Sequence, residues 1–253
     1  MKTAVISGGN GGLGRALTAG LQAQGWHVVA LDIATEGLEA GAALTPVRVD
    51  LTDGPALARA CTGIVAARPS IDLVVYNAGV SQIGPFERAS EESHRKVFEI
   101  NYFAAVNMAR GFLAPLRQSR GTHLAISSVA GFAPLVNRTA YAGSKHAMEG
   151  FFGSLRAEEA AHGVAVRIAA PSFVATNIGQ AGRDADGIIR PGAAADGVDY
   201  MTPAEAAEVI LRGLARRRDF IPVGRVARLA YLVNRASPAL YQRLMRRKIS
   251  GEG

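Results

Sequence analysis

Short apolar runs alternate with longer amphipathic stretches along most of the chain. Runs such as TAVIS near the start and HVVALDI at 27–33 show no alternation of apolar and polar positions, which is typical of strands buried on both faces. Helical spacing of apolar residues marks the stretches between the runs. The pattern predicts seven strands, at 2–7, 27–33, 47–51, 71–76, 122–127, 164–170 and 219–223, and main helices at 12–24, 55–67, 91–116, 139–162 and 202–217.

This alternation of strands and helices predicts the fold class. Short connections between the elements favour right-handed crossovers, and these give an α/β fold with a doubly wound, mostly parallel, seven-stranded sheet and helices on both faces. No internal repeat or interdomain linker interrupts the 253 residues, so we expect a single domain over 1–253. The long irregular stretch 177–201 is expected to form a substrate lid.

Composition narrows the class of protein further. With 49% hydrophobic and 19% charged residues, the chain is not a disordered protein. Cys61 is the one cysteine, and the five histidines show no metal-ligand spacing, so no metal site and a reducing compartment are expected. Because no secretory signal or apolar run of about 18 residues is present, a cytoplasmic protein without a transmembrane helix is predicted.

The net charge of +7 is concentrated near the end of the chain. Residues 212–248 hold 11 of the 28 basic residues and only Asp219 as an acid, which leaves 17 basic and 20 acidic residues elsewhere. Two basic amphipathic helices are expected within 225–248. Their arginines can be solvated while the helices pack on the lid or another subunit, or they can dock on an anionic membrane surface. No base-stacking platform supports nucleic-acid binding.

A glycine-rich segment, SGGNGGLG, follows the first strand and leads into a helix. Gly8, Gly12 and Gly14 allow the backbone to approach a pyrophosphate, and the start of the helix offers unpaired N–H groups to that anion. Asp32 ends the second strand, where an acid can bind both ribose hydroxyls of adenosine and repel a 2′-phosphate. We therefore expect NAD rather than NADP. Arg15, a nearby cation, is interpreted as a solvated helix residue.

Tyr141 and Lys145 are four residues apart and so share one face of the helix predicted at 139–162. A nearby ammonium group favours the phenolate and lowers a tyrosine pKa from about 10. Ser128 lies 13 residues before Tyr141, at the end of a strand, where folds of this class bind ligands. Ser127 is the alternative serine, and the spacing favours Ser128.

Taken together, these motifs resemble the short-chain dehydrogenase/reductase family over Lys2 to about Val223. SGGNGGLG is similar to the TGxxxGxG loop of that family, with Ser7 in place of threonine. YNAG at 76–79 is similar to NNAG, and PSFVAT at 171–176 is similar to PGxxxT. The resemblance implies a Rossmann-like fold. It also places Tyr76 beside the adenine side of the cofactor and Ser172 where glycine is usual.

The resemblance assigns roles to individual residues. Tyr141 is expected to be the general base or acid, Lys145 to lower its pKa and hold the nicotinamide ribose, Ser128 to orient the substrate oxygen, and Asn101 to hold a proton-relay water. The cofactor-binding set is expected to be Ser7, Gly8, Asn10, Gly12, Leu13, Gly14, Asp32, Ile33, Asp50, Leu51, Asn77, Ala78, Gly79, Tyr141, Lys145, Pro171, Val174 and Thr176.

We therefore expect an NAD-dependent oxidoreductase acting on a secondary alcohol or ketone, assembled as a homodimer or homotetramer. Apolar residues after the strands, namely Phe132, Pro134, Leu135, Val136, Val80, Ile83 and Phe86, either line a cleft for a hydrophobic substrate or belong to ordinary packing. The alternatives are an NADPH-dependent carbonyl reductase and a non-catalytic NAD-binding regulatory protein on the same fold.

Overall fold

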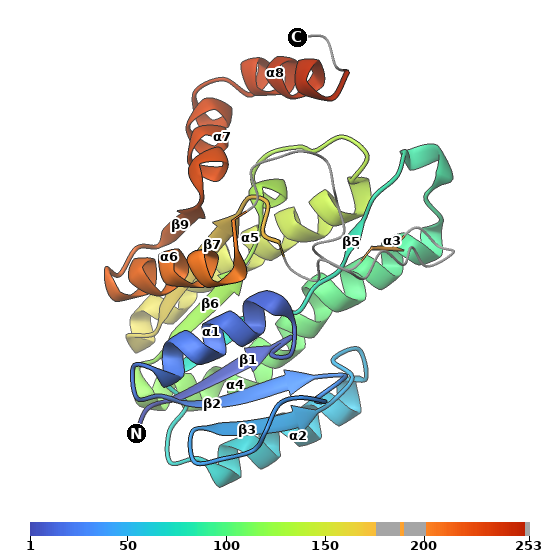
Figure 1. Ribbon diagram of the computed structural model, residues 1–253. Helices are drawn as coiled ribbons and strands as arrows, with labels where there is room; N and C mark the ends of the chain where they lie inside the picture. Colours follow the sequence, from blue (N-terminus) through green and yellow to red (C-terminus); the bar gives the residue numbers. More distant parts are fainter. Residues whose placement is uncertain (176–187, 190–200, 251–253) are drawn as a thin grey trace.

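The structure is a computed structural model that describes residues 1–175, 188–189 and 201–250. Figure 1 shows a central sheet with helices on both faces and two C-terminal helices standing away from the body. The main sheet has seven strands in the order β3-β2-β1-β4-β6-β7-β9, and every neighbouring pair is parallel. This confirms the predicted fold class. The strands are β1 (Thr3–Ser7), β2 (His27–Asp32), β3 (Leu44–Arg48), β4 (Leu73–Tyr76), β6 (Thr122–Ile126), β7 (Ala165–Pro171) and β9 (Phe220–Val223).

Helices α1 (Gly12–Gln22) and α6 (Pro203–Ala215) cover one face of the sheet. Helices α2 (Gly54–Ala67), α4 (Ala104–Ser119) and α5 (Thr139–Glu159) cover the other. Each face carries its own apolar core, since alternate residues of β4 point to opposite faces: Leu73 joins the α1/α6 core and Val74 the other. Helices α7 (Arg225–Ala236) and α8 (Pro238–Ser250) follow β9.

Three elements differ from the sequence prediction. Strand β3 covers Leu44–Arg48 rather than 47–51; it is an edge strand, where Pro46 can sit without breaking a ladder on both sides. The helix expected at 91–116 is divided into α3 (Glu91–Phe98), a π-helical turn (Glu99–Phe103) and α4. A small antiparallel pair, β5 (Ser81–Gln82) with β8 (Ile188–Ile189), was not predicted. Apart from β8 and Met201, the expected lid at 177–201 lies outside the described residues.

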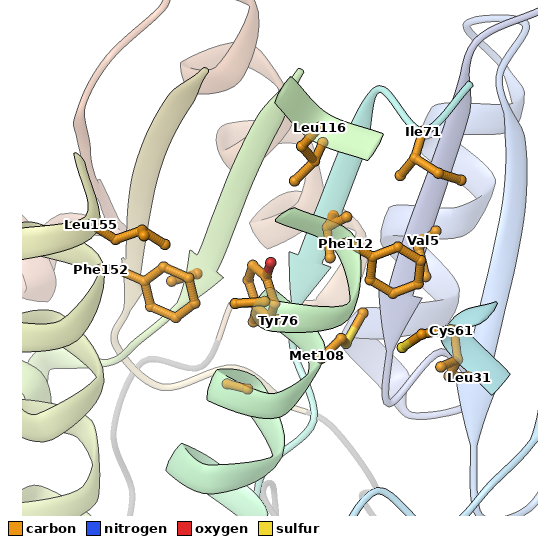
Figure 2. Packing of buried hydrophobic residues seen from close by; sticks show 14 of the residues in the cluster. Val5, Leu31, Cys61, Ile71, Tyr76, Met108, Phe112, Leu116, Phe152 and Leu155 are labelled. Carbon is orange, nitrogen blue, oxygen red and sulfur yellow. The ribbon is translucent and has the colours of Figure 1, made fainter. Parts of the chain in front are cut away.

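Tyr76 is buried in the core rather than beside the adenine side of the cofactor, which corrects the expectation from the motif. Its ring packs on Phe152 at 4.6 Å between centroids, and its hydroxyl lies 2.6 Å from Nδ1 of His123 on β6. Figure 2 shows the ring between Phe152 and Met108. Burial lowers the pKa of His123 to about 4, although the charge of Glu159 acts in the opposite direction.

We expect His123 to make the free energy of unfolding depend on pH. In the unfolded chain its pKa returns to about 6.5, so the unfolded state binds more protons between pH 4 and 6.5 and the folded state loses stability as pH falls through that range. One such group contributes a slope of up to about 1.4 kcal/mol per pH unit. The measurement is urea unfolding at several pH values. His123→Asn should flatten the slope and the exposed His162→Asn should leave it unchanged; equal slopes in all three proteins would contradict the assignment.

Candidate active site

Parallel pairing places the carboxyl ends of the strands at one edge of the sheet. The chain runs outward from β1 to β2 and β3, then returns to β4 on the other side of β1. This reversal is the switch point at which doubly wound folds bind ligands. The loops after β1, β4, β6 and β7 carry most of the residues that the sequence singled out, so the pairing brings them together.

The hydroxyl of Ser7 joins the first two of these loops. Ser7 Oγ accepts hydrogen bonds from the backbone N–H groups of Asn77 and Ala78, at 3.0 and 3.1 Å. In return, the side-chain amide of Asn77 donates to the carbonyls of Ser7 and Gly8, both at 3.0 Å. The Ser7 hydroxyl therefore joins the loop after β1 to the loop after β4, as a threonine hydroxyl at this position could also do.

The glycine loop is packed too closely for larger residues. Gly8 has a φ of 64°, in the left-handed region, and a Cβ there would lie 2.9 Å from the Cα of Ala78. A Cβ on Gly14 would overlap the carbonyl oxygen of Gly8. Helix α1 begins at Gly12 behind Gly11, which supplies no side-chain cap, and no acid occupies its first turn. Backbone N–H groups at this helix end remain available to an anion, so the loop fits a pyrophosphate. Leu13 is directed into the core beneath α1.

Asp32 is held at the end of β2 by the glycine loop. Its Oδ2 accepts a hydrogen bond from the backbone N–H of Asn10 at 2.9 Å, and its Oδ1 accepts one from Ala34 at 3.3 Å. Arg15 is an exposed residue of α1, and its guanidinium also donates to the carbonyls of Asn10, Glu36 and Gly37, each at 3.1 Å. Arg15 thus fixes the loop beside Asp32 through neutral acceptors.

Three more residues of the expected cofactor set follow β2 and β3, and among them the resemblance places Asp50 beside adenine. Ile33 follows Asp32 and exposes 55% of its surface. Asp50 accepts hydrogen bonds from Thr52 N at 2.9 Å and Thr52 Oγ1 at 2.7 Å. Leu51 packs against the core under α2.

Tyr141, Ser128 and Lys145 converge where α5 meets the end of β6. Tyr141 lies in the first turn of α5, and its hydroxyl is near enough to Ser128 for the serine hydroxyl to lower its pKa. Lys145 is almost fully buried; its Nζ donates to the carbonyl of Ile126 at 2.9 Å and lies 5.9 Å from the centre of the Tyr141 ring. The predicted spacing on one helix face thus produces a compact triad.

Desolvation by burial is the largest influence on the pKa values of Tyr141 and Lys145. Burial raises the pKa of Tyr141, while the hydrogen bond with Ser128 and the charge of Arg138 lower it. Burial also lowers the pKa of Lys145 to about 8, and the carboxylate of Glu149 opposes that change. The pKa of Tyr141 therefore responds first to burial, and then to Ser128 and Arg138.

Asn101 lies in the π-helical turn and is fully buried. Its Oδ1 accepts from Val80 N at 2.8 Å, and its Nδ2 donates to Val80 O and Ser144 Oγ, both at 2.9 Å. A Cβ on Gly79 would lie 3.1 Å from this Oδ1 and 3.5 Å from Lys145 Nζ. The side chain therefore anchors the loop after β4 to α5.

The segment after β7 is held by β9 and by Met201. Pro171 pairs with Val223 on β9, and Ser172 donates to the carbonyl of Val223 from both its N–H, at 3.1 Å, and its hydroxyl, at 3.3 Å. Val174 forms an isolated bridge with Met201. Thr176, the last residue of the expected cofactor set, lies outside the described residues.

The apolar residues for which a cleft and ordinary packing were both open lie in different surroundings. Phe132 packs edge-to-face on Phe220 and Tyr231, at 5.7 and 5.4 Å, so it belongs to the contact with α7 rather than to a cleft. Val136 and Phe86 remain exposed, on loops joined by the hydrogen bond from Gly84 N to Asn137 O at 2.9 Å.

Sequence reasoning missed one residue of this region. Ser127 donates its hydroxyl to Oε1 of Glu149 at 2.7 Å, whereas the Ser128 hydroxyl accepts from the backbone N–H of Ala130 at 3.2 Å and acts on Tyr141. Glu149 is the third member of a series at four-residue spacing, Tyr141, Lys145 and Glu149, and that periodicity is the signal that could have found it.

Over residues 1–175 and 201–250, none of the helices combines the length and the apolar character needed to cross a bilayer. The same part of the chain contains no group of three histidine, cysteine or acidic side chains placed to hold a metal ion.

A family model described as short chain dehydrogenase matches residues 2–187. Dehydrogenase/reductase SDR family member 7B of Bos taurus is 32% identical over 260 residues, which cover 95% of this chain and 79% of that protein.

Two solved structures share the fold and differ in cofactor. A short chain dehydrogenase from Burkholderia cenocepacia J2315, in complex with NADP, is 26% identical with a TM-score of 0.83, covering 96% of this chain and 97% of the other. A short chain dehydrogenase/reductase from Burkholderia phymatum, in complex with NAD, is 25% identical with a TM-score of 0.81 and 95% coverage of both chains. The family model and the bovine relative each span most of the sequence, and the chain belongs to the short-chain dehydrogenase/reductase family of nicotinamide-dependent oxidoreductases.

Proposed function

We propose that this protein is an NAD-dependent oxidoreductase that transfers a hydride between the nicotinamide and a secondary alcohol or ketone. The observation that carries the proposal is the convergence of Tyr141, Ser128 and Lys145 at the switch-point edge of the sheet. A hydrophobic substrate is favoured because Phe86 and Val136 expose apolar surface on two joined loops beside this edge.

The chain's own groups supply proton transfer and orientation. Ser128 donates a hydrogen bond to the substrate oxygen and positions it beside the Tyr141 hydroxyl. In oxidation, the tyrosinate accepts the alcohol proton; in reduction, the phenol returns a proton to the carbonyl oxygen. Lys145 in its cationic form stabilises the phenolate and is placed to bind a ribose hydroxyl. The nicotinamide, when bound, supplies or accepts the hydride.

Asp32 and Arg15 support NAD as the cofactor. The Asp32 carboxylate lies at the end of β2, where it would bind ribose hydroxyls and repel a 2′-phosphate. Arg15 is the cation nearest this loop by sequence, and its three hydrogen bonds hold backbone carbonyls. The glycine loop, which a Cβ at Gly14 would fill, provides the matching pyrophosphate cradle.

Helices α4 and α5, with the turn before α4, support the proposal of a homodimer or homotetramer. Phe103 exposes 44% of its surface there and contacts Tyr102, whose ring meets Phe151 of α5 edge-on. This partly exposed aromatic cluster on the π-helical turn and α5 is apolar surface that a second copy of the chain would cover.

We further propose that the outer face of α7 and α8 docks on an anionic lipid surface. The helices pack on the segment after Ser128 through Ala227, Ala230 and Tyr241, with Asn234 donating to the Phe132 carbonyl at 2.7 Å. Leu229 and Leu232 each expose 65% of their surface, and Leu240 and Leu244 are exposed on α8. Leu229 therefore lies outside the face of α7 that Ala227 and Ala230 bury against the body of the protein.

The charge of this arm, residues 225–248, complements an anionic surface. Arg225, Arg228 and Arg235 share the outward side of α7 with the exposed leucines. Residues 220–251 contain no acid. In a helix that lies at a membrane interface, leucines insert among the lipids and arginines bind the lipid phosphates, which is the arrangement proposed for α7. Because α7 follows β9, it lies at the same edge of the sheet as the site, and Figure 1 shows both helices projecting from the body.

The test of the catalytic proposal is turnover of a graded panel of secondary alcohols, from short-chain to sterol-sized, with NAD. We expect activity to rise with apolar size. Tyr141→Phe should lower kcat by a factor of about 100 or more while NADH still binds, because only the proton-transfer group is removed. The control is Tyr102→Phe, which removes a hydroxyl outside the triad. Tight NADH binding without turnover on any member would favour a regulatory protein.

Cofactor choice is tested separately. Wild type should have a higher kcat/KM with NAD than with NADP. Asp32→Ser removes the charge that repels a 2′-phosphate and should shift the ratio toward NADP by about tenfold or more. Asp50→Ser is the matched control, since a change on the adenine side should affect both cofactors equally. A wild type that prefers NADPH would show that the Asp32 interpretation is wrong.

The lipid proposal is tested by sedimentation with vesicles. Wild type should bind vesicles containing phosphatidylglycerol at low salt and ignore pure phosphatidylcholine. Replacing Arg225, Arg228 and Arg235 with glutamine should weaken binding about a hundredfold, at about 1 kcal/mol per charge near the surface. The control replaces Arg216, Arg217 and Arg218, which carry the same charge at the opposite edge of the sheet. If Leu229→Asp instead dissociates an oligomer and vesicles do not bind, the face contacts a second copy and the proposal fails.

A further inference from the structure

Three consecutive residues at the end of β6 are contacted by three residues of α5 spaced four apart. Tyr141 lies beside Ser128, Lys145 Nζ donates to the carbonyl of Ile126, and Glu149 Oε1 accepts from the hydroxyl of Ser127. Residues at this spacing form one row along a helix. Two of the three contacts belong to the catalytic triad, and the third has no assigned role.

The third contact, between Glu149 and Ser127, is tightly packed. A Cβ on Gly131, in the turn that follows Ser128, would overlap both Ser127 Oγ and Glu149 Oε1. Ser127 is also fixed through its backbone, because its N–H donates to the carbonyl of Ala169 on β7 at 2.7 Å. The carboxyl group therefore fills a pocket that only a glycine at 131 leaves open.

We propose that Glu149 is a positioning residue of the active site, which holds the Ser127–Ser128 turn in register with α5 and places a negative charge beside Lys145. This inference rests on the function proposed above. Glu149 acts on Ser128 through Ser127 and on Tyr141 through the charge of Lys145, so it reaches the reacting atoms only through other residues.

The charges around this row agree with that role. Burial raises the pKa of Glu149, whereas the bond from Ser127 and the charges of His146 and Lys145 lower it. Lys145 is acted on by burial, which lowers its pKa, and by Glu149, which raises it. Arg138 acts on Tyr141 at the start of the helix. Glu149 is thus the acid whose charge supports the cationic form of Lys145.

Two variants separate the two parts of the proposal. Glu149→Gln keeps an oxygen that accepts from Ser127 and removes the charge. Lys145 should then lose its proton at lower pH, and the alkaline limb of the kcat profile should move down by about one pH unit. Ser127→Ala keeps the carboxyl group and removes the bond, so kcat should fall several-fold while the alkaline limb moves less than in Glu149→Gln. The exposed Glu158→Gln on the same helix is the control and should match wild type.

A second measurement distinguishes failure of this inference from failure of the proposed function. The chain has four lysines, Lys2, Lys96, Lys145 and Lys248, so ¹³C-lysine NMR resolves the titration of Lys145, assigned with Lys145→Arg. The Lys145 pKa should fall in Glu149→Gln whether or not a substrate is known. A wild type that turns over no alcohol would overturn the function alone. An unchanged Lys145 titration in Glu149→Gln, or variants that alter only the unfolding temperature, would overturn the positioning role.

Discussion

Parallel pairing of β1, β4 and β6 is the constraint on which the rest of the site depends. It places residues about 70 positions apart, such as Ser7 and Asn77, within hydrogen-bond distance at one edge of the sheet. Each loop is then held by its neighbour: Ser7 bonds the turn after β4, Asn101 bonds Val80 in that turn, and α5 bonds the end of β6. A shift of one strand by a single residue would break all of these contacts together.

The three residues of the row on α5, Tyr141, Lys145 and Glu149, are ionisable groups that burial affects in the same way. Desolvation opposes the charged forms of Tyr141, Lys145 and Glu149 alike, so the three groups depend on one another and on the few hydrogen bonds that reach them. A cofactor ribose and a substrate oxygen would add partners to the first two.

The sequence was sufficient for the fold class, which depends on the alternation of strands and helices along the chain, and for the row that carries Tyr141 and Lys145, which depends on periodicity within one helix. It placed β3 too late, since Pro46 is tolerated only because the strand is at the edge of the sheet. It placed Tyr76 beside the adenine side, whereas pairing with His123 draws the ring into the core. It missed Glu149 because the partner hydroxyl, Ser127, lies on another element and only tertiary packing brings the two together.

The π-helical turn at Glu99–Phe103 joins α3 to α4 and constrains how many residues the chain can have between these two helices. Such a turn holds one residue more than an α-helical turn would, and each residue rotates a helix by about 100°. A chain with one residue fewer between α3 and α4 could form an unbroken helix, but Asn101 and the apolar face of α4 could not then both keep their directions. Insertions and deletions should therefore be rare in this stretch among relatives that retain the Asn101 contact, even where the residue identities vary.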